Sequence, residues 1–120
     1  MMVLDSFAWI EYFMGSRRGD TVRGYVEGEE ALYTPAVCLT EIKSRYLREG
    51  KDPTTRINYI IERSLVISVD KDMALSAADI KHKLKLHTVD ALVYACSKSK
   101  NLTLVTGDQH FRGLPMVEII

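Results

Sequence analysis

The chain has 120 residues, 47% of them hydrophobic and 27% charged, which is the size and composition of one globular domain with its own core. Its 16 basic residues balance 16 acidic ones, so no overall positive charge attracts nucleic acid, and a polyanion must be held by local patches or by bound cations. No apolar run approaches the roughly 20 residues of a membrane span, and the early aspartate in "MMVLDSF" argues against a secretory signal. We therefore expect a cytoplasmic protein that does not enter a membrane.

Short strand-type runs alternate with helix-type segments along the chain. The runs rich in Val, Ile, Leu and Thr that indicate strands are 2–5, 31–34, 65–69, 102–106 and 116–120. The helix-type segments between them are 6–15, 19–28, 35–50, 53–64, 70–86 and 88–101. Strands separated by helices cannot form hairpins and instead imply crossovers. The sequence predicts one α/β domain over residues 1–120, a three-layer α/β/α sandwich with a mostly parallel five-stranded sheet.

Side chains at the segment ends give the expected boundaries of the helices. Asp20, Thr34 and Asp70 are residue types that begin helices by accepting a hydrogen bond from a free backbone N–H group. The two cysteines, Cys38 and Cys96, lie in apolar segments without a CxxC pair or a metal-finger spacing. We expect both cysteines to be reduced core residues.

Two acidic residues follow strands of the predicted sheet. In open α/β sheets, ligands bind beyond the carboxyl ends of the strands, where the strand order reverses. Asp5 ends the first strand, and Asp108 follows the fourth. Each also has a simpler interpretation, Asp5 as a helix N-cap and Asp108 as a turn residue after Gly107. Two acids at the same edge of the sheet nevertheless favour a shared site.

A glutamate lies among apolar residues of the 35–50 helix. The helical neighbours of Glu41 include Val37, Cys38 and Ile42, which places Glu41 on or beside the apolar stripe. Glutamate is rarely buried without a partner. One interpretation is a boundary residue paired with Arg45 one turn later. The other is a carboxylate that projects along the sheet edge toward the first strand.

The segment "TVDALVYAC" is apolar except for Asp90 near its start. With Thr88 as N-cap, Asp90 would lie in the first turn, where a carboxylate gains roughly 0.3–1 kcal/mol from the helix dipole. That is a sufficient structural reason for the residue. The helix behind it, however, is apolar on all sides and must pack between other elements, which puts its first turn beside neighbouring structure.

Four carboxylates in one crevice would repel one another. At about 5 Å and an effective dielectric constant near 20, each ionised pair costs roughly 3 kcal/mol. Such a cluster retains protons or binds cations, and oxygen ligands select Mg²⁺ or Mn²⁺. Such ions activate water for attack on a phosphodiester. The expected catalytic and metal-binding residues are Asp5, Glu41, Asp90 and Asp108, with hydroxyl support from Ser6 and Thr106.

The same residues lie in four motifs that resemble the PIN domain of VapC-type ribonuclease toxins. The motifs are "VLDSFAWIEYF", "AVCLTEI", "TVDALVYACS" and "LTLVTGDQHFRGLPMVEI", in the family's order. The resemblance implies a PIN-like fold and an endoribonuclease that is the toxin of a VapBC-type pair, dependent on Mg²⁺ or Mn²⁺. It further implies a homodimer and an antitoxin whose C-terminal segment lies across the active groove. Many relatives have a second acid shortly after the position of Asp108, where this chain has Gln109 and His110.

Further side chains are candidates for contacts with RNA or with a protein partner. The basic residues expected to follow an RNA backbone, or else to form a solvated face, are Lys81, Lys83, Lys85, Arg17 and Arg18. His82 is expected at the surface, whereas His87 and His110 lie near the acids in sequence. Trp9, Tyr12 and Phe13 form an aromatic group suited to the core and, where exposed, to an interface.

Two other functions remain open from the sequence. A receiver-like signalling domain is also a five-stranded parallel α/β fold, and Asp70 after the third strand would be its phosphoacceptor, with Asp5 helping to bind Mg²⁺. The second alternative is a catalytically silent PIN-fold interaction module, in which loss of Asp5 or Asp90 changes no activity.

Overall fold

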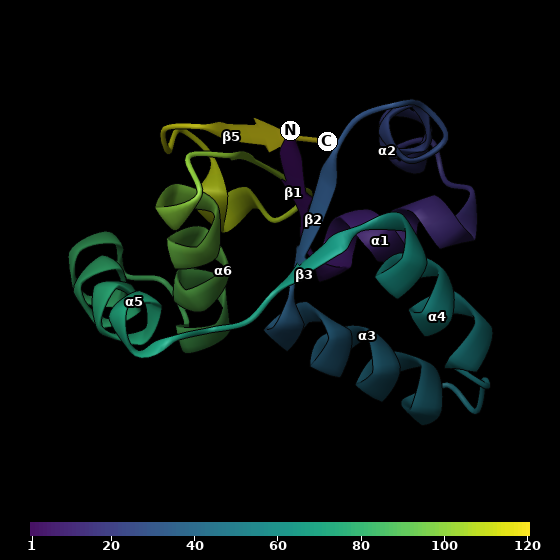
Figure 1. The fold of residues 1–120 in the computed structure, drawn as a ribbon, viewed down its shortest axis with the longest axis horizontal. Coiled ribbons are helices and arrows are strands. Elements are labelled where there is room, and N and C mark those ends of the chain that lie inside the picture. The colour runs from purple at the N-terminus through teal and green to yellow at the C-terminus, as the bar shows by residue number, and fades with distance from the viewer.

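The strand-type runs form one sheet in which every pairing is parallel (Figure 1). The computed structural model describes all residues from 1 to 120. The strands are β1 (Met2–Leu4), β2 (Leu32–Pro35), β3 (Leu65–Ile67), β4 (Thr103–Thr106) and β5 (Val117–Ile119). Their order is β3-β2-β1-β4-β5, so the sheet grows outward from β1 in both directions. The predicted five-stranded parallel sheet is confirmed. The strands are parallel because helical segments between them carry the chain back to the same end of the sheet.

All six predicted helices are present. They are α1 (Ser6–Met14), α2 (Gly19–Val26), α3 (Ala36–Arg48), α4 (Thr54–Arg63), α5 (Lys71–Leu84) and α6 (Thr88–Ser99). A short 3₁₀ helix, η1 (Gln109–Phe111), follows β4. In Figure 1, α5 and α6 lie on one side of the strands and α1 to α4 on the other. None of the helices is both long enough and apolar enough to cross a bilayer.

The sheet separates two hydrophobic cores, which confirms the three-layer sandwich. Because successive side chains of a strand point to opposite faces, Val3 packs with α5 and α6 while Leu4 packs with the helices of the other face. Leu104 and Val105 of β4 divide in the same way. Cys38 and Cys96 are both buried with free thiols, as expected.

The strand order argues against the receiver-like alternative. Receiver domains have the order 2-1-3-4-5, whereas this sheet has β2 between β1 and β3. Asp70, the expected phosphoacceptor, is the N-cap of α5, and its side chain accepts a hydrogen bond from the Met73 N–H group. It follows the edge strand β3, two strands away from β1, so it does not share a crevice with Asp5.

Two of the three expected helix caps are wrong. Asp70 caps α5, but Asp20 lies inside the first turn of α2, after Arg18 at the N-cap. Thr34 lies in β2, and Pro35 begins α3. The Thr34 hydroxyl is fully buried and accepts a hydrogen bond of 3.0 Å from the indole N–H of Trp9. Buried polar groups need a hydrogen-bond partner, and Thr34 finds this partner in the core instead of at a helix end.

Two glycines of α2 give a matched pair for testing how closely α1 and α2 pack. A Cβ at Gly19 would overlap the backbone carbonyl of Glu11 in α1, and backbone atoms cannot move aside as a flexible side chain does. We expect Gly19→Ala to lower the free energy of unfolding by about 2 kcal/mol, as overpacking does. Gly24 lies on the same helix with open space around it, so Gly24→Ala should raise that free energy by roughly 0.5–1 kcal/mol. Urea denaturation of both variants measures the contrast, and equal effects would contradict the close approach.

Candidate active site

The carboxyl ends of β1 and β4 place two of the predicted acids next to each other. The two strands are adjacent at the centre of the sheet, with Leu4 in register with Val105. The chain leaves β1 through Asp5 and leaves β4 through Asp108. The strand order reverses between β1 and β4, and this is the point at which open α/β sheets bind ligands. The region beyond these two strand ends is called the crevice.

Asp5 is both a helix cap and a buried acid. Its Oδ1 accepts a hydrogen bond of 2.9 Å from the Ala8 N–H group, so the cap interpretation is confirmed. The residue is only 6% exposed. Burial raises the pKa of Asp5 to about 7, against the opposing effect of hydrogen bonds from Thr106 and Ala8, and the negative charges of Glu41 and Asp108 raise it further. The carboxylate is therefore held rigidly in a position that disfavours its own charge.

Glu41 reaches the same crevice from α3. The Ser6 hydroxyl donates a hydrogen bond of 2.8 Å to Oε1 of Glu41, which joins the start of α1 to the middle of α3. Its neighbour Ile42 is buried and Glu41 itself is exposed, so of the two predicted positions, on or beside the apolar stripe, Glu41 has the second. The alternative pairing with Arg45 does not form, because Arg45 pairs with Glu49 instead.

Asp90 lies in the first turn of α6, as predicted, although His87 rather than Thr88 occupies the N-cap. The rest of α6 is largely buried, so this turn faces the crevice instead of open solvent. Burial raises the pKa of Asp90, and the charges of Asp108 and Glu41 raise it further. The imidazoles of His110 and His87 act in the opposite direction.

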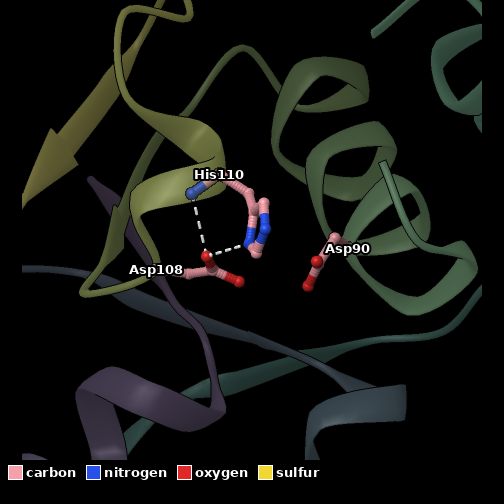
Figure 2. A group of neighbouring side chains, drawn as sticks. All are labelled: Asp90, Asp108 and His110. Carbon is pink, nitrogen blue, oxygen red and sulfur yellow. Dashed lines mark hydrogen bonds and ion pairs between the residues drawn. The ribbon is translucent and has the colours of Figure 1, made fainter. Parts of the chain in front are cut away.

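Asp108 is half-buried and is held by the turn that follows β4. The Thr106 hydroxyl accepts the Asp108 N–H at 3.0 Å, which fixes the backbone at this point. The Asp108 Oδ1 accepts the His110 N–H at 2.9 Å and lies 2.7 Å from the His110 Nδ1 (Figure 2). Figure 2 shows the Asp90 carboxylate pointing toward this pair from α6. One ligand atom from each of these three residues lies within 4.8 Å of the others.

The four carboxylates share one electrostatic environment. Glu41 and Asp108 raise the pKa of Asp5 from two sides, and the same two residues raise the pKa of Asp90. No lysine or arginine forms an ion pair with any of the four, and the one basic side chain in contact with them is His110, whose ring lies 2.7 Å from Asp108. A cluster of carboxylates that repel one another and have no lysine or arginine partner fits a hard divalent cation.

His110 contacts one of the acids directly, since its Nδ1 lies 2.7 Å from Oδ1 of Asp108. The His87 ring lies 6.0 Å from the His110 ring, with the planes nearly perpendicular. Sequence spacing placed both histidines near acids, but only the turn formed by η1 brings His110 between Asp108 and Asp90.

The basic residues expected to contact RNA lie in different places. The Lys81 ammonium group donates to the hydroxyl of Thr88, which lies two residues before Asp90 at the start of α6. The Arg18 guanidinium lies over the Phe7 ring, 5.7 Å from its centroid, beside the start of α1. Lys83 and Lys85 line a separate depression beneath α5, and Arg17 is exposed.

Solved structures of toxin–antitoxin proteins have the same fold. A chain of a toxin–antitoxin complex from Klebsiella pneumoniae is 19% identical, with a TM-score of 0.83 over 98% of this chain and 96% of that one. VapC20 from Mycobacterium tuberculosis, described as a sarcin-ricin loop cleaving toxin, is 19% identical, with a TM-score of 0.77 over 99% and 98% of the two chains. A chain of the DNA-bound VapBC from Salmonella typhimurium is 18% identical, with a TM-score of 0.68 over 99% and 96%. At these identities the likeness concerns the fold.

Sequence comparison gives a family for nearly the whole chain. A search of curated protein sequences finds no match. The family model of the PIN domain, however, matches residues 2–115, a range that contains all four acids and both supporting hydroxyls. Together with the strand order and the acids at the ends of β1 and β4, this match establishes that the chain belongs to the PIN domain family.

Proposed function

We propose that the chain is a divalent-metal-dependent endoribonuclease and the toxin of a VapBC-type toxin–antitoxin pair. The observation that supports the proposal is that Asp90 and Asp108 lie together with His110, within 4.8 Å of one another, while the charges of Glu41 and Asp108 act on both Asp5 and Asp90. No lysine or arginine forms an ion pair with any of these acids. Membership of the PIN family and the shared fold with toxins of known pairs support the reaction class.

The residues of the crevice divide into ligands and supports. Asp5, Asp90 and Asp108 would hold Mg²⁺ or Mn²⁺ through carboxylate oxygens, and Glu41 would bind a second ion or orient the attacking water. A bound divalent ion would polarise the phosphodiester and lower the pKa of a water molecule. The Ser6 hydroxyl positions Glu41 through its hydrogen bond. The Thr106 hydroxyl positions both acids at the strand ends, through the Asp108 N–H group and the Asp5 carboxyl.

The proposed partners are an antitoxin and a second copy of the chain. Around α1, the side chains of Tyr12, Phe13, Met14 and Tyr59 border an open cleft of about 720 Å³, whereas Trp9 is buried. Partly exposed aromatic residues are typical of protein interfaces, and this face is the proposed contact for the antitoxin segment. The structurally similar chain from Klebsiella pneumoniae belongs to a toxin–antitoxin complex. The two free buried thiols suit the reducing cytoplasm.

Incubation of the pure protein with single-stranded and structured RNA tests the proposal. We expect cleavage with Mg²⁺ or Mn²⁺ and none with EDTA, because the carboxylates alone cannot stabilise added negative charge. Restoration by excess metal would show that EDTA acts by removing the ion. Cleavage that persists in EDTA would contradict a metal-dependent mechanism, and no cleavage under any condition would favour the silent interaction module.

A further inference from the structure

A second polar cleft lies between α1, α3 and α4, next to the acidic site. Its volume is about 460 Å³. Its polar lining consists of Arg45, Glu49, Lys51 and Arg56, and its aromatic lining includes Phe13 and Tyr46. None of these residues belongs to the acidic site, and the cleft is therefore a feature that the proposed chemistry has not used.

The cleft carries an excess of positive charge. Glu49 is its one acid, and it is shared by Arg45 at 3.0 Å and Lys51 at 3.3 Å. Arg56 has no acidic partner. Its guanidinium lies over the Tyr46 ring, 4.8 Å from the centroid, and 5.9 Å from the Phe13 ring centroid. Stacking fixes the plane of Arg56 while its N–H groups remain available to an anion.

The Tyr46 hydroxyl also lacks a partner. It is the one buried side-chain N or O atom of the chain that makes no hydrogen bond, although the residue is only 4% exposed. A buried hydroxyl without a hydrogen bond is costly, and its donor suits a charged oxygen. The unpaired Arg56 guanidinium lies over the same ring whose hydroxyl is enclosed and has no partner, and both groups favour an anion at this cleft.

The helix register places this cleft next to the acids along α1 and α3. The Ser6 hydroxyl bonds to Glu41, which fixes α1 and α3 side by side at the acidic end. One helical turn further along each helix lie Ile10 and Arg45, and both line the cleft. One turn of helix advances about 5.4 Å. The cleft therefore begins within one turn of the acidic site, in the direction in which both helices run.

We propose that this basic cleft binds a phosphate of the RNA strand next to the one that is cleaved, with Arg56 and the Tyr46 hydroxyl as its principal contacts. The assignment rests on the proposed ribonuclease function, because that function puts a polyanion across Glu41 and toward the cleft. The planar fork of arginine matches two phosphate oxygens, and the Phe13 ring offers a face on which a base stacks. RNA is favoured over an acidic peptide because the cleft begins within one helical turn of the site proposed to act on phosphodiesters.

Equilibrium binding of a fluorescein-labelled single-stranded RNA tests the assignment without cleavage. All variants are made in an Asp90→Asn background with Mg²⁺, and anisotropy is measured over a series of salt concentrations. Arg56→Gln should raise the Kd about three- to tenfold and reduce the slope of log K against log salt by about 0.7, the value for one lost single-strand phosphate contact. The matched control is Arg48→Gln, an exposed arginine of α3 outside the cleft, which should change neither quantity.

Tyr46→Phe separates a ligand contact from a structural role. The Tyr46 hydroxyl is buried without a hydrogen bond, which destabilises the free protein. Its removal should therefore leave the melting temperature of the free protein equal or higher. The same change should weaken RNA binding about threefold. A merely structural tyrosine would not combine greater stability with weaker binding. Equal RNA affinity in Tyr46→Phe, Arg56→Gln and Arg48→Gln would overturn the assignment.

The cleft assignment and the ribonuclease function would fail under different experimental outcomes. If the wild-type protein cleaves RNA and the cleft variants bind like the control, the cleft assignment alone fails. If the wild-type protein never cleaves RNA but Arg56→Gln weakens binding with the expected salt slope, the ribonuclease function fails and the cleft remains a phosphate site. If Arg56→Gln weakens binding of a poly-glutamate peptide and leaves RNA binding unchanged, the cleft serves an acidic protein segment and the assignment is wrong.

Discussion

Asp90→Asn should reduce RNA cleavage at saturating Mg²⁺ by about 10²- to 10³-fold, the usual cost of removing one charged group from a preorganised site. The asparagine has nearly the same shape, so the first turn of α6 should persist. The substitution removes a carboxylate whose negative charge is disfavoured by the nearby charges of Asp108 and Glu41. A bound divalent cation would stabilise that charge. Single-turnover cleavage of a labelled RNA measures the effect, and isothermal titration with Mn²⁺ should show weaker metal binding in parallel.

Asp72→Asn is the matched control for this prediction. Asp72 is also an aspartate in the first turn of a helix, α5, but it is exposed and follows the edge strand β3 instead of β1 or β4. Both variants lose the same favourable interaction with a helix dipole, roughly 0.3–1 kcal/mol. If Asp72→Asn cleaves like the wild type and Asp90→Asn does not, the loss comes from the crevice. Full activity in Asp90→Asn would show that Asp90 is only a helix-terminal charge.

Asp5→Asn should stabilise the metal-free protein above neutral pH. The pKa of Asp5 in the folded chain is about 7, above its ordinary value of 3.8, so folding favours the protonated form. The favourable contribution of this group is complete below the ordinary pKa and is lost as the pH rises to the folded pKa. Linkage gives a loss on the order of 4 kcal/mol between about pH 4 and pH 7, which Asp5→Asn removes because an amide does not ionise.

Urea denaturation in EDTA at pH 5 and pH 8 measures this effect, and Asp70→Asn is its matched control. Asp70 caps α5 with the same hydrogen-bond geometry with which Asp5 caps α1, 2.8 Å against 2.9 Å, but it is exposed. Asparagine caps helices as well as aspartate does, so neither substitution should cost a cap. We expect Asp5→Asn to be more stable than the wild type at pH 8 and Asp70→Asn not to be. Added Mg²⁺ should stabilise the wild type more than Asp5→Asn, and no stabilisation at pH 8 would contradict a strained buried carboxylate.

The types and order of the elements could be predicted from the sequence because each depends on neighbours along the chain. Strand-type runs and helical periodicity are local patterns, and all five strands and six helices follow from them. The positions of Asp5 and Asp108 follow as well, since a residue that ends a parallel strand lies at the carboxyl edge of the sheet. Asp90 in a first helical turn is equally local.

Errors arose where a side chain had a distant alternative partner. Thr34 has the right chemistry for a helix cap, but it binds Trp9, 25 residues earlier, within the core. For Glu41 the sequence left two interpretations open, and the pairing with Arg45 at helical spacing does not form because Ser6 of another helix donates a hydrogen bond to Glu41. A local pattern gives the partners that are within reach, and only packing decides among them.

The sequence by itself determined the α/β class, the edge of the sheet at which the acids lie, and the residue types that suit a divalent cation. Only the tertiary structure decided that β1 and β4 are neighbours, that the pKa of Asp5 rises to about 7, and that Arg56 and Tyr46 flank a basic cleft beside Glu41. The physical reason is that burial and charge interactions depend on distance in space, and strand order sets that distance for residues far apart in the chain.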